Sequence, residues 1–120
     1  MFTDADIISI YTRQQAFNDG VLADLTTLFP AECRVYRYPV ACTESIWRII
    51  ENAVDAKQGD LKGLVGDLLW MSKKGIIKKL SESTMLFQVS IGRKNRTFQV
   101  NVGPGDNLEP VVTIMMEGED

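Results

Sequence analysis

Seven basic residues cluster in the second half of the chain, and they are the residues best suited to binding a charged partner. Residues 68–99 contain 7 basic residues and 1 acid, residues 1–67 contain 6 basic and 10 acidic residues, and residues 100–120 contain 5 acids and no base. A positive surface of this kind attracts phosphates or an acidic protein surface. The alternative is a solvated helix end with a charged hairpin tip, which protects strand edges from aggregation. The seven residues are Lys73, Lys74, Lys78, Lys79, Arg93, Lys94 and Arg96.

Arg13 is a further candidate for partner binding. It follows Thr12 and precedes an Asp19-Gly20 turn. In a functional interpretation, Arg13 holds an acidic partner or a phosphate beside this turn. In a structural interpretation, which ordinary turn chemistry favours, it pairs with Asp19 or Asp24 and fixes the connection between two elements.

The chain lacks the usual residues of catalysis and metal binding. It contains no histidine, which excludes histidine-dependent triads, histidine general bases and the commoner zinc sites. Two cysteines cannot close a zinc site, and Cys42, the better nucleophile because it precedes a helix cap, needs a neighbouring cation or helix N-terminus to become reactive. Glu44 and Glu51 form no more than a carboxylate pair at helical spacing. We therefore expect a protein that is not an enzyme and has no cofactor or metal.

The loop at residues 103–109, Gly-Pro-Gly-Asp-Asn-Leu-Glu, contains oxygen ligands that suit a cation. It lacks the Lys-Ser/Thr of a phosphate-binding loop and the ligand spacing of a calcium loop. Weak cation binding by Asp106, Asn107 and Glu109 is one alternative. A plain loop between strands is the other, and the pattern favours it.

Two long helices are expected to position the basic residues. An apolar stripe with helical spacing predicts a helix from Asp60 to Leu80, with Trp70 in the core and the lysines in its last two turns. Its glycines, Gly63, Gly66 and Gly75, predict the close approach of a neighbour. A second helix, from Glu44 to about Lys57, begins at a Thr43 cap and folds back against the first across a short turn.

Alternating apolar residues predict the strands. Residues 6–11 form a first strand, residues 85–91 and 96–102 form a hairpin around a four-residue loop that pairs Ile91 with Arg96, and Pro110–Met116 form another strand. The predicted fold is therefore α+β, an antiparallel sheet of three to four strands with a two-helix hairpin packed on one face. One domain spans residues 1–120, and its acidic end, residues 117–120, is a solvated tail. No apolar run is long enough to cross a membrane and no signal peptide is present, which predicts a cytoplasmic location.

Two stretches resemble a family of small bacterial proteins of unknown function. They are residues 6–24, DIISIYTRQQAFNDGVLAD, and residues 103–115, GPGDNLEPVVTIM. Residues 38–40 and 69–71 fit the middle of the same family. The resemblance implies an accessory role on plasmids, integrative elements and phages, and it implies no activity.

The leading functional prediction is a non-catalytic protein that binds a host protein, with inhibition of a defence system as one form of this role. The alternative is a nucleic-acid-binding module that uses the basic surface of residues 73–96. The net charge of −3 opposes unspecific binding to nucleic acid. Salt dependence distinguishes the two predictions, because each phosphate contact steepens the fall of affinity with salt.

Overall fold

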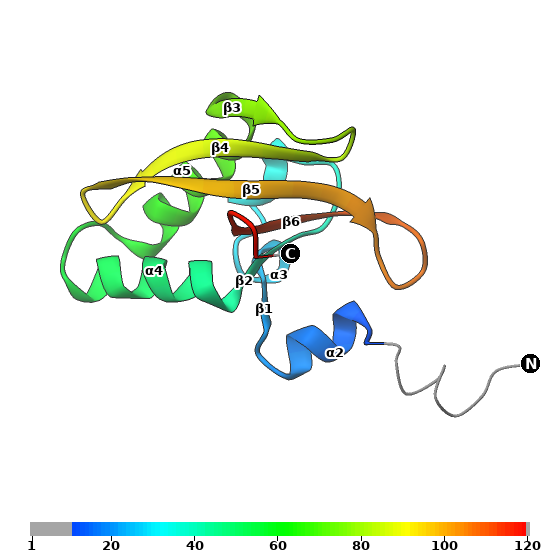
Figure 1. The fold of residues 1–120 in the computed structure, drawn as a ribbon. Coiled ribbons are helices and arrows are strands. Elements are labelled where there is room, and N and C mark those ends of the chain that lie inside the picture. Colours follow the sequence, from blue (N-terminus) through cyan, green and yellow to red (C-terminus); the bar gives the residue numbers. More distant parts are fainter. Residues whose placement is uncertain (1–10, 120) are drawn as a thin grey trace, which may run out of the picture.

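The computed structural model describes residues 11–119 and shows a layer of helices against one face of a sheet (Figure 1). Its helices and strands alternate irregularly along the chain. In order they are α2 (Arg13–Asn18), β1 (Leu22–Asp24), α3 (Leu25–Leu28), the 3-10 helix η1 (Glu32–Val35), β2 (Val40–Thr43), α4 (Glu44–Asp55), α5 (Leu61–Lys74), β3 (Ile76–Lys79), β4 (Thr84–Ile91), β5 (Lys94–Pro104) and β6 (Pro110–Met116). Within residues 11–119, no helix has the length and apolar character needed to cross a bilayer.

The sheet has six strands in the order β1-β2-β6-β5-β4-β3, and it corrects the predicted fold. An antiparallel sheet of three to four strands is wrong, because β2 pairs with β6 in parallel, with Val40 opposite Val112. The short strand β2 has the sequence Val-Ala-Cys-Thr, in which the first three residues are buried. A strand buried on both faces shows no alternation of apolar and polar residues, so periodicity did not reveal it.

Helices α4 and α5 pack against each other and against the same face of the sheet. Ile46 and Ile50 of α4 and Leu68 and Leu69 of α5 are fully buried. On the sheet they meet the alternate side chains that face the helices, of which Phe87 and Phe98 are the largest and stack edge to face with ring centres 6.0 Å apart. The helical spacing of the buried α4 and α5 residues thus predicted which helix faces form the core.

The long helix ends at Lys74, and the prediction that it extends to Leu80 is wrong. Gly75 lies so close to β4 that a Cβ atom there would be 2.5 Å from the carbonyl oxygen of Gln88. The chain then leaves the helix and forms β3, in which Ile76 and Ile77 are β-branched and favour a strand. Trp70 is also outside the core, because its side chain is 55% exposed.

The β4–β5 hairpin has a two-residue turn instead of the predicted four-residue loop. Gly92 and Arg93 form it with φ angles of 66° and 62°, as a type I′ turn requires. Ile91 therefore pairs with Lys94 and Phe87 with Phe98. This register differs from the predicted one by two residues along β5, so each side chain still lies on the predicted face.

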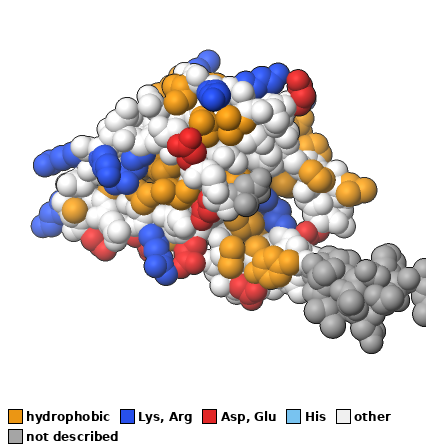
Figure 2. All heavy atoms as spheres, in the orientation of Figure 1, with side chains coloured by type: hydrophobic (Ala, Val, Ile, Leu, Met, Phe, Trp, Pro, Cys, Tyr) orange, Lys and Arg blue, Asp and Glu red, His pale blue; other side chains and the backbone are white. Residues whose placement is uncertain are grey.

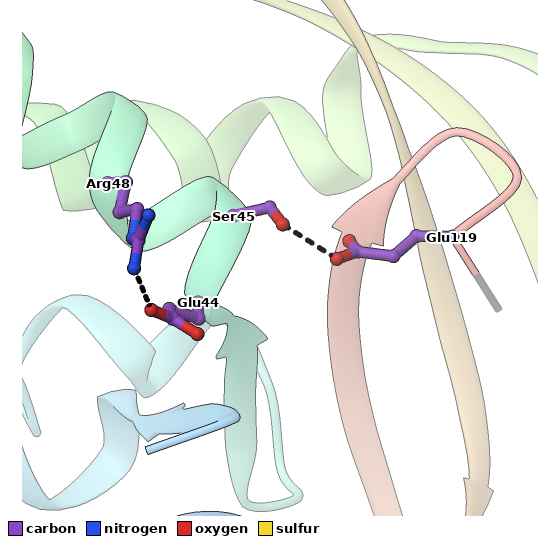
Figure 3. A network of polar contacts seen from close by, with 4 residues as sticks. All are labelled: Glu44, Ser45, Arg48 and Glu119. Carbon is purple, nitrogen blue, oxygen red and sulfur yellow. Dashed lines mark hydrogen bonds and ion pairs between the residues drawn. The ribbon is translucent and has the colours of Figure 1, made fainter.

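Both ends of the described chain are fixed by side-chain contacts. Thr12 caps α2 with a capping box, whereas most of the strand predicted at residues 6–11 lies outside the described residues. At the other end, the Glu119 carboxylate accepts hydrogen bonds from Thr43 Oγ1 and Ser45 Oγ, each at 2.8 Å. Figure 3 shows the hydrogen bond of Ser45 with Glu119 beside the ion pair of Glu44 with Arg48 on α4. Residues 117–119 are exposed, but Glu119 anchors them to the start of α4.

Candidate functional site

The structure divides the seven clustered cations into two groups. Lys79 pairs with Met85 near one end of β4, whereas Lys94 pairs with Ile91 at its other end. Met85 and Ile91 are six positions apart along the strand, which corresponds to roughly 20 Å. Figure 2 accordingly shows basic side chains in separate areas, at the tip of the β4–β5 hairpin and along the β3 edge. The predicted single basic surface therefore does not form.

The hairpin tip carries Arg93, Lys94 and Arg96. Arg93 and Lys94 are exposed. Arg96 is half-buried, and its Nε donates a hydrogen bond to the carbonyl oxygen of Ile91 at 3.0 Å, which closes the turn. Two of the three side chains are thus available to a partner, while the third stabilises the hairpin.

The Arg13 side chain forms hydrogen bonds within the protein. Its guanidinium donates hydrogen bonds to Thr113 Oγ1 at 2.7 Å and to the carbonyl oxygen of Val112 at 3.0 Å. Burial lowers the pKa of Arg13, although nearby carboxylates, that of Asp106 first, act in the opposite direction. These contacts agree with the structural interpretation of Arg13, but they tie α2 to β6 instead of pairing with Asp19 or Asp24.

The other basic group surrounds β3, the edge strand of the sheet. All four residues of β3 are exposed. Ile76, Ile77 and Leu80 have exposed fractions of 37%, 53% and 46%. Sequence reasoning placed these apolar residues in a helical core and so missed them as surface residues. The signal for the correct assignment was Gly75 directly after two lysines, which is a common end of a helix.

An apolar groove of about 300 Å³ adjoins β3 on the helix side of the sheet. It forms because α5 ends before the sheet does, so the helix leaves part of the apolar sheet face uncovered. Its lining includes Ile76, Met85, Val100 and Val102, together with Tyr36, Ser72 and Lys73. Val102 is 38% exposed, which shows that this part of the sheet face is open to solvent.

Polar groups fix one wall of the groove. Ser72 Oγ donates a hydrogen bond to the carbonyl oxygen of Leu69 at 2.6 Å, which uses its only proton. The Tyr36 hydroxyl, 2.6 Å from Ser72 Oγ, therefore donates to it and keeps its own lone pairs free. Burial raises the pKa of Tyr36 despite this hydrogen bond, so the hydroxyl stays neutral.

Lys73 and Glu82 line the groove, and further lysines lie on and beside the edge strand. Lys73 Nζ lies 5.1 Å from the centre of the Tyr36 ring and donates to the carbonyl oxygen of Val35 at 2.7 Å. Lys74 Nζ lies 5.5 Å from the centre of the Trp70 ring. Among residues 11–119, the ion pair made by this group joins Lys79 to Glu82 at 3.4 Å. We call Lys73, Lys74, Lys78, Lys79, Ile76, Ile77, Leu80 and Val102 the β3 surface.

The cysteines considered for catalysis are buried, and the loop considered for cation binding takes part in hydrogen bonds that hold the fold together. Cys33 and Cys42 are buried free thiols, and burial, followed by the charge of Glu119, raises the pKa of Cys42 to about 12. In the loop at residues 103–109, the Asp106 carboxylate accepts from the backbone N–H groups of Arg13 and Gln14 at 2.7 and 3.0 Å. Within the described chain, no group of three or more Cys, Asp or Glu residues is arranged to hold a metal ion.

Comparison with known proteins gives a family without an assigned activity. A family model described as "Family of unknown function (DUF6573)" matches residues 1–120. No curated protein and no solved structure matches the chain. The resemblance to a family of unknown function is thus confirmed over the whole chain, while the link to mobile elements stays a prediction.

Proposed function

This chain belongs to the family of unknown function DUF6573, and we propose that it is a non-catalytic protein that acts by binding a host protein through the β3 surface. The observation that carries this proposal is the combination of exposed apolar side chains and lysines on one sheet edge. Ile76, Ile77 and Leu80 stand in solvent beside four lysines and one nearby acid, Glu82.

The β3 surface has the composition of a docking site. Contiguous apolar side chains rimmed by polar groups are characteristic of interaction surfaces. The lysines make this surface positively charged, so the partner that fits it carries acidic residues around an apolar centre. Complementary charge also increases the rate at which such a partner associates.

The finer part of the proposal concerns the biological setting. The resemblance of residues 6–24 and 103–115 to proteins of plasmids, integrative elements and phages supports an accessory role on a mobile element. In that role the protein acts in the cytoplasm on a host machine such as a defence system. Occupying a surface of that machine requires no catalytic group.

Affinity capture with a matched pair of charge-reversal variants tests the proposal. Lys78→Glu/Lys79→Glu changes the β3 surface, and Arg93→Glu/Lys94→Glu makes the same change in charge at the hairpin tip. We expect the wild type and the hairpin-tip variant to retain the same protein from a bacterial lysate, and the β3 variant to lose it. Retention by the β3 variant, or no reproducible retention by the wild type, contradicts the proposal.

A second candidate function is nucleic-acid binding, now confined to the hairpin tip. Arg93 and Lys94 favour it because both are exposed and neither forms an ion pair within residues 11–119. A gel-shift experiment at low salt tests it, with a slope of roughly −0.7 to −0.9 in log K against log salt for each phosphate contact. The same two variants distinguish the functions, since Arg93→Glu/Lys94→Glu abolishes this binding only if the tip carries it.

A further inference from the structure

The β3 strand leaves backbone hydrogen-bonding groups open at the sheet edge. The Leu80 N–H donates to the carbonyl oxygen of Thr84 at 2.9 Å, and Lys78 and Lys79 are opposite Leu86 and Met85. In an antiparallel ladder, hydrogen-bonded and non-hydrogen-bonded pairs alternate. Lys78 and Leu80 therefore direct their backbone groups toward β4, and Lys79 directs its N–H and C=O away from the sheet.

A bulge precedes Lys79 on the same edge. The register between β3 and β4 shifts between Ile76 and Lys78, so Ile77 is the additional residue with no partner on β4. The Gln88 N–H donates to the carbonyl oxygen of Gly75 at 3.0 Å, so Ile76 and Phe87 form a non-hydrogen-bonded pair. Ile76 therefore directs its N–H and C=O away from the sheet, as Lys79 does. The edge thus has a backbone pattern that fits one further strand.

The side chains around this edge determine which strand fits. Ile76 and Lys79 are opposite Phe87 and Met85 and face the helix side, where the groove lies, whereas Lys78 is opposite Leu86 and faces the other side. Residues of an added strand directly opposite lysines are stabilised when they are acidic. Lysines therefore stand on both faces of the edge, and the apolar groove adjoins one of them.

A second copy of this chain does not suit the edge. If the outward groups of Lys79 in one copy bond those of Lys79 in another, the two Lys79 side chains lie directly opposite each other. Like charges in such a position are destabilising, and the four lysines of each copy meet at the same seam. Lysines on an edge strand also prevent unspecific pairing, so they admit an acidic strand and exclude a basic one.

We propose that the partner binds by strand addition: an extended segment of a partner protein pairs with β3 through the outward N–H and C=O of Lys79. Acidic side chains of this segment contact Lys78 and Lys79, and an apolar side chain occupies the groove beside Met85, Val100 and Val102. This inference rests on the proposed function and adds the chemical class and the binding mode of the partner segment.

A displayed library of random ten-residue peptides, selected on the full chain, provides the probe. We expect the enriched peptides to alternate acidic and apolar residues. A synthetic peptide of an enriched sequence is then titrated against two variants at one position, Lys79→Ala and Lys79→Pro. Both lack the lysine side chain, but only proline lacks the outward N–H, and proline is tolerated at edge positions whose N–H faces solvent.

Strand addition predicts that Lys79→Pro binds the peptide at least about tenfold more weakly than Lys79→Ala, because a hydrogen bond is lost and the proline ring blocks the added strand. Equal affinity of the two variants overturns strand addition. If Lys79→Pro fails to fold, N-methylation of single peptide bonds in the probe replaces it. Strand addition then predicts that N-methylation at alternate positions of the peptide weakens its binding at least about tenfold. If N-methylation weakens binding at no position, the inference is overturned.

The outcomes separate this inference from the proposed function. One outcome is that the peptides lose binding to Lys78→Glu/Lys79→Glu but bind Lys79→Pro and Lys79→Ala with equal affinity. In that case the β3 surface remains the docking site and strand addition is overturned. A selection that enriches no peptide with alternating acidic and apolar residues also overturns strand addition. Enriched peptides that bind Lys78→Glu/Lys79→Glu as tightly as the wild type contradict both.

Discussion

Replacing Gly75 with alanine tests the account of how α5 ends and β3 begins. A Cβ atom at Gly75 would lie 2.5 Å from the carbonyl oxygen of Gln88 and 2.9 Å from that of Met71. Both are backbone atoms, so the helix end and β4 must separate to admit the methyl group. The φ angle of Gly75 is −95°, which alanine adopts freely, so the cost comes from the contacts alone.

Overpacking of this kind destabilises a protein by about 1–3 kcal/mol. In a domain of this size 1 kcal/mol corresponds to about 4 °C in melting temperature, so Gly75→Ala should lower it by about 4–12 °C. The assay is thermal unfolding followed by circular dichroism.

Gly66 supplies a matched control in the same helix. A Cβ atom at Gly66 meets only Glu32 Cγ at 3.7 Å, which is an ordinary contact. Because alanine is favoured over glycine in a helix by about 1 kcal/mol, Gly66→Ala should raise the melting temperature. A Gly75→Ala protein that is at least as stable as the wild type would refute the close approach of α5 and β4.

Three further predictions concern buried and exposed groups. Trp70→Ala should change the free energy of unfolding by less than about 1 kcal/mol because Trp70 is exposed, whereas Leu68→Ala should cost about 2–5 kcal/mol in a chemical denaturation series. Partial burial raises the pKa of Glu119, but its three hydrogen bonds lower it more, so its folded pKa lies below the ordinary value. The stability that it contributes is complete above its unfolded pKa and is lost as the pH falls through the folded pKa, so Glu119→Gln, compared with Glu117→Gln, should flatten the acid decline of melting temperature. With a pKa of about 12, only about one Cys42 thiol in ten thousand is ionised at pH 8, so a thiol reagent should label it rapidly only after unfolding.

The sequence predicted the elements whose pattern is local. The helical spacing of Ile46 and Ile50 and of Leu64 and Leu68 identified the buried faces of α4 and α5, and alternation identified β4, β5 and β6. The register of the hairpin was wrong by two residues because its turn requires a positive φ at Arg93, which glycine or asparagine usually supplies. Period-2 alternation could not detect this error, since a shift of two keeps every side chain on its face.

The parallel strand and the edge strand depend on contacts between distant residues. Strand β2 pairs with a strand that is about seventy residues away along the chain, and no local pattern carries that information. At β3, Ile76, Ile77 and Leu80 continue the helical spacing of α5, so periodicity extended the helix. The approach of β4 at Gly75 ends it. The same error concealed the β3 surface, because residues assigned to a helical core were not considered as surface residues.

Site-specific photo-crosslinking in cells tests most directly whether a partner docks on the β3 surface. A photoreactive amino acid replaces Ile77, which is 53% exposed, and in a matched control it replaces Lys94 at the exposed hairpin tip. We predict a cross-linked protein with the probe at residue 77 and none with the probe at residue 94. Cross-linking from residue 94 but not from residue 77 would contradict the assignment of the β3 surface as the docking site.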